Sequence, residues 1–167
     1  MAMAGRRMEQ AKESNSTMIY RKGSLFNAAS NGAVLTHACN ASGVWGAGIA
    51  KKFAIKYPIA FNEYKNWCEK DPNILVGSYL KIKDSNITIT CLFTSAGYGD
   101  TKDSEQTILE NTEKSIKALL HSMPYRSVIN SPRINAGLFK VPWEKTEKII
   151  KACLLDRPDI MWIIWEG

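Results

Sequence analysis

The chain has 167 residues, of which 45% are hydrophobic and 23% charged, and its formal net charge is +6. This balance is that of an ordinary globular domain and excludes a wholly disordered chain. No apolar run approaches the roughly 20 residues needed to cross a bilayer, so we expect no membrane partner. A positive charge suits an anionic ligand, but it would suit nucleic acid equally, so charge alone does not choose between them.

The first 17 residues differ in composition from the rest. Arg6 and Arg7 are not followed by an apolar stretch, which excludes the pattern of a secretory signal. We expect residues 1–17 to be a flexible basic leader and residues 18–167 to form one domain.

The four cysteines are widely scattered, at Cys39, Cys68, Cys91 and Cys153. Their spacing does not match a zinc site. We therefore expect free, buried thiols in a reducing compartment, which places the protein inside the cell, in the cytoplasm, the nucleus or both. We predict no metal and no other cofactor.

In the first half of the chain the pattern predicts strands at Met18–Lys22 and Ala33–His37. A helix over Gly48–Tyr57 follows, and Pro58 separates it from a second helical stretch. Two more strands, Leu75–Ile82 and Ile87–Thr94, are joined through Asp84-Ser85-Asn86.

In the second half, Asp103 is predicted to cap a helix, with Gln106 completing a capping box. A short strand at Ser127–Asn130 and a helix beginning near Pro142 come next. Ile160–Trp165 is the last strand. Strands that alternate with helices predict an α/β fold of three layers, α/β/α, with a mixed, mostly parallel central sheet. Ligands of such folds bind beyond the carboxyl ends of the strands.

The first motif whose residues suit binding or catalysis runs from His37 to Ala50 and contains HACN followed by GVWGAGIA. A buried strand ends there, passes through a glycine-rich loop and enters a helix. Glycines let the backbone approach a ligand, and a helix N-terminus attracts anions. The pattern is neither a P-loop nor a dinucleotide fingerprint. A tight turn whose glycines serve packing alone explains this sequence equally well.

The second motif, SPRINAGLF, again lies between a strand and a helix. Backbone amides around Asn135–Leu138 are suited to close over a phosphate from the opposite side. One such loop is unremarkable, but two of them in one α/β chain favour a diphosphate clamp.

Three side chains of the first motif are candidates for chemistry. His37, expected at the end of its strand, suits an acid, a base or a phosphate donor, or simply hydrogen-bonds its neighbours. Asn40 offers a donor and an acceptor to a ribose hydroxyl, or forms the turn. Trp45 is the one tryptophan that we consider as a ligand platform.

The runs HACNASGVWGAGIAKKF and SPRINAGLFKVPWEKT resemble the macrodomain family. The resemblance covers about Met18 to Trp165. The sequence more closely resembles one branch of this family, which contains the fungal ADP-ribose 1″-phosphate phosphatase and the terminal ADP-ribose protein glycohydrolase. It implies a cleft for ADP-ribose above the sheet. The residues it implies for binding are Gly23, Ser24, Leu25, Ala38, Cys39, Asn40, Trp45, Gly46, Ala47, Gly48, Ile49, Ala50, Ile134, Asn135, Ala136, Gly137, Leu138 and Phe139.

Ser24 stands where the family usually has an acid that reads the adenine amino group, so the resemblance does not extend to adenine selectivity through a carboxylate. Two departures separate the branches: Ser95 and Phe139 stand where the glycohydrolase branch has a lysine and an aspartate. The resemblance therefore favours the phosphatase, with His37 and Asn40 as catalytic residues and an ADP-ribose derivative as small-molecule partner. A reader of ADP-ribose and a hydrolase acting on ADP-ribosylated proteins are the alternatives. Nucleic acid ranks last, because lysines alternate with acids along most of the helices.

Overall fold

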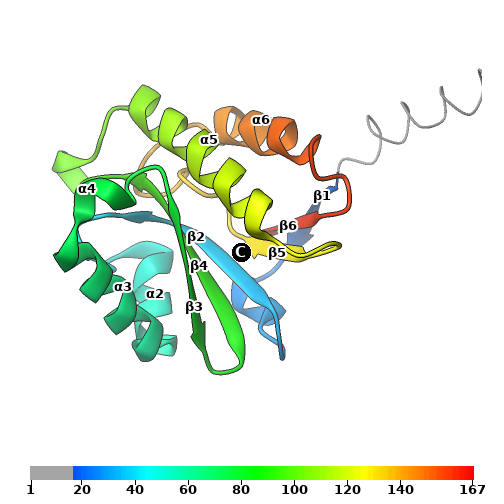
Figure 1. The fold of residues 1–167 in the computed structure, drawn as a ribbon, viewed down its shortest axis with the longest axis horizontal. Helices are drawn as coiled ribbons and strands as arrows, with labels where there is room; N and C mark the ends of the chain where they lie inside the picture. The colour runs from blue at the N-terminus through cyan, green and yellow to red at the C-terminus, as the bar shows by residue number, and fades with distance from the viewer. Residues whose placement is uncertain (1–16) are drawn as a thin grey trace, which may run out of the picture.

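The computed structural model describes residues 17–167, which form one six-stranded sheet between two layers of helices (Figure 1). The predicted leader lies outside the described residues, except for Thr17. The strands are β1 Met18–Lys22, β2 Val34–Asn40, β3 Tyr79–Asp84, β4 Ile87–Ser95, β5 Val128–Ser131 and β6 Met161–Glu166. The helices are η1 Leu25–Ala28, α2 Gly48–Lys56, α3 Pro58–Lys70, α4 Pro72–Leu75, η2 Gly99–Thr101, α5 Glu105–Ser122 and α6 Trp143–Leu154.

The strand order is β1-β6-β5-β2-β4-β3, and only β3 runs antiparallel to its neighbour. The predicted α/β/α class with a mostly parallel sheet is therefore confirmed. Alternate residues of β2 face the two helical layers: Leu35 and Cys39 join the core under α2 and α3, while Val34 and Ala38 pack toward α5 and α6. Among residues 17–167, no helix combines the length and apolarity that crossing a membrane requires.

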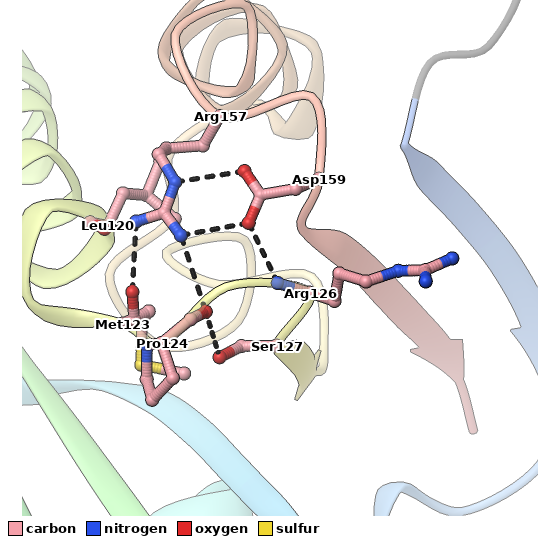
Figure 2. A network of polar contacts seen from close by, with 7 residues as sticks. All are labelled: Leu120, Met123, Pro124, Arg126, Ser127, Arg157 and Asp159. Atoms are coloured by element: carbon pink, nitrogen blue, oxygen red, sulfur yellow. Dashed lines mark hydrogen bonds and ion pairs between the residues drawn. The ribbon is translucent and has the colours of Figure 1, made fainter.

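The amino-terminal ends of β5 and β6 are joined by a polar network around Arg157 (Figure 2). Its guanidinium donates to the carbonyl oxygens of Leu120, Met123 and Pro124, which close α5, and it pairs with Asp159 at 2.9 Å. Carbonyls at a helix C-terminus lack the N–H donors of a following turn, and Arg157 supplies donors to last-turn Leu120, to the C-cap Met123 and to Pro124 after it. This network ties the α5–β5 connection to the α6–β6 connection, at the sheet edge away from the predicted loops.

Two predicted boundaries outside the first glycine motif are wrong. Leu75 ends the short helix α4 instead of opening a strand, because Gly77, with φ 80°, turns the chain before β3 begins. Ser104, not Asp103, is the N-cap of α5: its hydroxyl accepts from the Thr107 N–H at 3.2 Å. The Asp103 carboxylate is engaged elsewhere, since it accepts from the Ala96 N–H at 2.9 Å.

Candidate functional site

The loops predicted to bind a ligand lie at one edge of the sheet. Because five strands are parallel, the segments after β1, β2, β4, β5 and β6 all emerge there. The first glycine loop follows β2 and the second follows β5, and these two strands are direct neighbours. The structure thus brings both motifs to the expected edge.

The first loop is fixed by the side chain of Asn40. Its amide oxygen accepts from the backbone N–H groups of Ser42 and Val44, at 3.0 and 3.3 Å, and from the Tyr64 hydroxyl at 2.9 Å. Its amide nitrogen donates to the Val44 carbonyl at 2.8 Å. Asn40 is therefore the clamp of the loop, and only one amide hydrogen of this 6% exposed residue is left for a ligand.

Trp45 anchors the same loop from inside. Its ring is 3% exposed, stacks on Tyr64 with centroids 4.6 Å apart and meets the His37 ring edge-on at 4.7 Å. The expectation that Trp45 is an open platform for a ligand is wrong, because its ring faces the core. Gly46, Ala47 and Gly48 remain exposed beside it, so the loop presents backbone to solvent.

Helix α2 begins in this exposed stretch. Ala47 is its N-cap and provides no side-chain hydrogen bond, so the first N–H groups of the helix have no capping side chain. These groups and the helix dipole favour an anion at this end. Ile49 and Ala50 are half-buried, which limits their contribution to a ligand to the backbone and part of the side chain.

The second loop leaves the core and returns to it, and the residues at both of its ends are buried. Asn135 and Val141 are 4% and 2% exposed, and the Val141 N–H donates to the Asn135 carbonyl at 2.9 Å. Between them, Gly137 and Leu138 are exposed, and Ala136 and Phe139 are half-buried. Ile134 is also predicted to bind the ligand. At 2% exposure it belongs to the core, so its side chain is out of reach of a ligand.

The two loops touch each other. A Cβ placed on Gly48 would lie 3.3 Å from Cδ1 of Leu138, and Gly48 has φ +60°. Glycine therefore serves two needs at this position: a left-handed backbone and close approach of the second loop. This close approach brings the two loops together beyond the ends of β2 and β5.

His37 is not at the end of its strand. It lies in the middle of β2, which continues to Asn40 because His37–Asn40 pair with Cys91–Ser95 of β4. The side chain is 0% exposed and stacks on Phe53 with centroids 4.1 Å apart. Burial lowers the pKa of His37 to about 3, so the ring is neutral at physiological pH. This buried placement in mid-strand does not favour the expectation of a histidine beside the ligand.

His37, Cys39 and Cys91 form a cluster that the sequence spacing did not reveal, with ligand-type atoms within 4.8 Å of one another. The Cys39 sulfur lies 3.6 Å from Nδ1 and 3.5 Å from Nε2 of His37. A sulfur nearly equidistant from both nitrogens lies over the ring face, since in the ring plane it would overlap Cε1. The nitrogen lone pairs lie in that plane and point elsewhere, so this geometry is sulfur–ring packing and not the arrangement of metal ligands. Burial also raises the pKa of the Cys39 thiol.

The residues after β1 complete the edge. Ser24 is exposed and caps η1, its hydroxyl accepting from the Phe26 N–H at 3.2 Å, while Leu25 is 3% exposed and belongs to the core. Gly23 has φ +121° and lies against the Trp165 ring. Of the three residues in this segment that are predicted to bind the ligand, Ser24 is therefore the one with an exposed side chain.

A groove of about 760 Å³ lies elsewhere, on the sheet face beside η1. Arg21, Asn27, Lys81, Asn130 and Trp165 are among its lining residues, which include no residue of either glycine loop. The groove is thus a separate feature of the fold, and the two glycine loops remain the candidate site.

With the loops and their supports in place, the chain can be compared with known proteins. The Macro domain family model matches residues 36–150, which contain both loops. The chain belongs to the Macro domain family. This Macro domain is 37% identical over 163 residues to the ADP-ribose 1″-phosphate phosphatase of Meyerozyma guilliermondii, covering 81% of this chain and 93% of the relative. It is 41% identical over 145 residues to the protein of the same name from Candida albicans, covering 79% and 90%.

Solved structures agree on the fold. The macrodomain of Mycobacterium tuberculosis DarG matches with a TM-score of 0.74 at 20% identity, covering 90% of this chain and 97% of that chain. Thermosipho africanus DarTG in complex with ADP-ribose matches with a TM-score of 0.70 at 15% identity, covering 88% of this Macro domain and 41% of that chain.

Proposed function

We propose that this protein is an ADP-ribose 1″-phosphate phosphatase, which hydrolyses the terminal phosphate to give ADP-ribose and inorganic phosphate. The observation that carries the proposal is the contact between Gly48 and Leu138, which joins two anion-suited loops over adjacent parallel strands. The names of relatives that match 79–81% of this chain support the same substrate.

In the proposed reaction a water oxygen attacks the phosphorus of the 1″-phosphate. The bond from phosphorus to the ribose oxygen breaks, and that oxygen takes up the proton that the attacking water releases, so that a ribose hydroxyl and inorganic phosphate result. The loops contribute by holding the diphosphate of the substrate through the backbone N–H groups of Gly46–Gly48, Gly137 and Leu138. The Ala136 N–H is already engaged, since it donates to the Arg133 carbonyl at 3.3 Å. Positioning of this kind and stabilisation of developing charge are the main sources of rate in phosphoryl transfer.

His37 does not fit a direct role in this reaction. A fully buried neutral imidazole, stacked on Phe53, reaches neither a water nor a phosphate. Asn40 remains adjacent to the site, with one amide hydrogen free to meet a ribose hydroxyl. We therefore propose that His37 supports the first loop through Trp45 and that Asn40 contributes both to the loop and to ribose binding.

The burial of His37 favours a second candidate, a reader that binds ADP-ribose, free or on modified proteins, without turnover. The same loops suffice for that function. A hydrolase that removes ADP-ribose from proteins is less well supported, because Ser95 is 0% exposed and its hydroxyl donates to the Gly97 carbonyl at 2.8 Å. Its oxygen is held inside the loop and does not face a ligand.

The test combines two measurements on one preparation. Calorimetric titration with ADP-ribose measures binding, and phosphate release from ADP-ribose 1″-phosphate measures turnover. Binding with release is the expected result, and release should persist after EDTA treatment if no metal takes part. Binding without release would replace the phosphatase by the reader. If ADP-ribose did not bind, both candidates would be excluded.

A further inference from the structure

The side chain of Asn135 is hidden beneath the second loop. The residue is 4% exposed, and its backbone has φ 67°, in the left-handed region that asparagine tolerates better than most residues. A polar side chain in this position has to find partners inside the protein.

Asn135 finds them on three other elements. Its amide oxygen accepts from the Thr94 hydroxyl of β4 at 2.9 Å. Its amide nitrogen donates to the hydroxyls of Thr112 in α5, at 2.9 Å, and Thr146 in α6, at 3.4 Å. All three threonines are 0% exposed. One side chain therefore links the loop to the sheet and to both helices of one layer.

Thr94, the β4 residue of this network, lies at an irregularity in the pairing of β2 with β4. The register between β2 and β4 shifts at Cys39/Asn40, which pair with Phe93 and Ser95 and leave Thr94 without an opposite residue. Such bulges turn a side chain out of the regular ladder. The Thr94 carbonyl accepts instead from Nδ2 of Asn111 in α5, at 3.1 Å. Two buried asparagines thus meet the same threonine, but only Asn135 belongs to a ligand loop.

The network and the backbone bond from Val141 to Asn135 fix where the exposed part of the loop begins and ends. Residues 136–140 lie between these two points. The N–H groups of Ala136 and Lys140 donate to the carbonyls of Arg133 and Gly137, which leaves those of Gly137–Phe139 for the ligand of the proposed function. Their position relative to the first loop therefore depends on the Asn135 side chain.

We propose that Asn135 is a positioning residue, whose buried amide sets the second loop in register with the first and thereby sets the affinity for the diphosphate of the ligand. This inference rests on the proposed function for the role of the loop. The side chain itself does not touch the ligand, which distinguishes it from the backbone contacts expected of its neighbours.

The decisive variant is Asn135→Gly. Glycine accepts the same left-handed backbone without strain but lacks the amide, so the variant separates conformation from hydrogen bonding. We expect the dissociation constant for ADP-ribose to rise at least about tenfold. In phosphate release the rise should appear in KM, with kcat within about twofold of wild type, since the diphosphate is held alike in ground and transition states.

Asn111→Ala is the matched control. It also removes a buried asparagine from Thr94, so a comparable loss of stability is expected, measured by urea unfolding of both variants. Under conditions in which both are folded, Asn111→Ala should bind ADP-ribose as wild type does.

The outcomes separate the two proposals. Wild-type affinity in Asn135→Gly, or an equal loss of affinity in Asn111→Ala, would overturn the positioning role while leaving the proposed function intact. Failure of the unaltered protein to bind ADP-ribose would instead overturn the proposed function, and the inference with it.

Discussion

The two glycine loops present similar backbone to the ligand but are held in different ways. The first combines the hydrogen bonds of Asn40 within the loop with a support of aromatic rings beneath it, where Trp45 lies between Tyr64 and His37. The second is supported by hydrogen bonds from Asn135 to threonines of β4, α5 and α6. Apolar packing loses stability in proportion to the atoms removed, whereas a buried polar network leaves unsatisfied groups when one member is lost. Substitutions in the aromatic support of the first loop should thus cost stability in proportion to the ring volume removed. Substitutions beneath the second loop should cost stability when they leave a hydrogen-bonding group without a partner.

The largest effect is expected from removing the central ring under the first loop. Trp45→Ala should lower the free energy of unfolding by about 3–5 kcal/mol, the usual range for a buried tryptophan. Trp67→Ala is the control, because Trp67 is 43% exposed, and its cost should be about 1 kcal/mol or less. Urea unfolding of both variants measures the difference. Similar losses would show that the aromatic support is not what holds the first loop.

The next effect concerns pH. His37 has its usual pKa of 6.5 when unfolded and about 3 when folded, so the unfolded state binds the proton more tightly. The free energy of unfolding should therefore fall as pH drops below about 6.5, by about 1.4 kcal/mol per unit until about pH 3. Between about pH 7 and pH 5 this amounts to about 2 kcal/mol.

His37→Gln should flatten that slope, and His121→Gln, which changes an exposed histidine in the last turn of α5, should not. Urea unfolding across the pH range checks both. The same His37→Gln protein should still release phosphate at neutral pH, and loss of turnover in a folded variant would restore a catalytic role for His37.

A smaller effect is expected where the loops meet. Gly48→Ala places a methyl group 3.3 Å from Leu138 and a side chain at φ +60°, so ADP-ribose affinity should fall about five- to tenfold. Gly32→Ala is the control: its φ is +83° with nothing within 4 Å, so it carries backbone strain of about 1–2 kcal/mol but no loop contact. Calorimetry should show a loss of affinity in Gly48→Ala alone. If Gly32→Ala weakened binding as much, strain and not loop contact would be the cause.

The smallest effect tests the segment after β1. Aspartate caps helices as well as serine does, so Ser24→Asp should change the free energy of unfolding by less than about 0.5 kcal/mol. A carboxylate accepts stronger hydrogen bonds than a hydroxyl. The preference for ADP-ribose over its hypoxanthine analogue should therefore rise in competition titrations, and an unchanged preference would mean that Ser24 does not face the base.

The sequence by itself determined the class of the fold, the order along the chain of the six strands and of the helices α2, α3, α5 and α6, and the two loops. These features depend on local patterns: apolar runs for strands, Pro58 and Pro142 at helix starts, and glycines in the loops. It also indicated the family, because both motifs are contiguous in the chain.

Only the tertiary structure decided which way the side chains face. The burial of His37 and Trp45 depends on Phe53 and Tyr64, and the role of Asn135 depends on threonines 41, 23 and 11 residues away. Polar residues at the end of β2 resemble a loop in sequence, yet pairing with β4 makes them strand. Contacts between distant segments set burial, and burial sets both the pKa of a histidine and the partners of an amide.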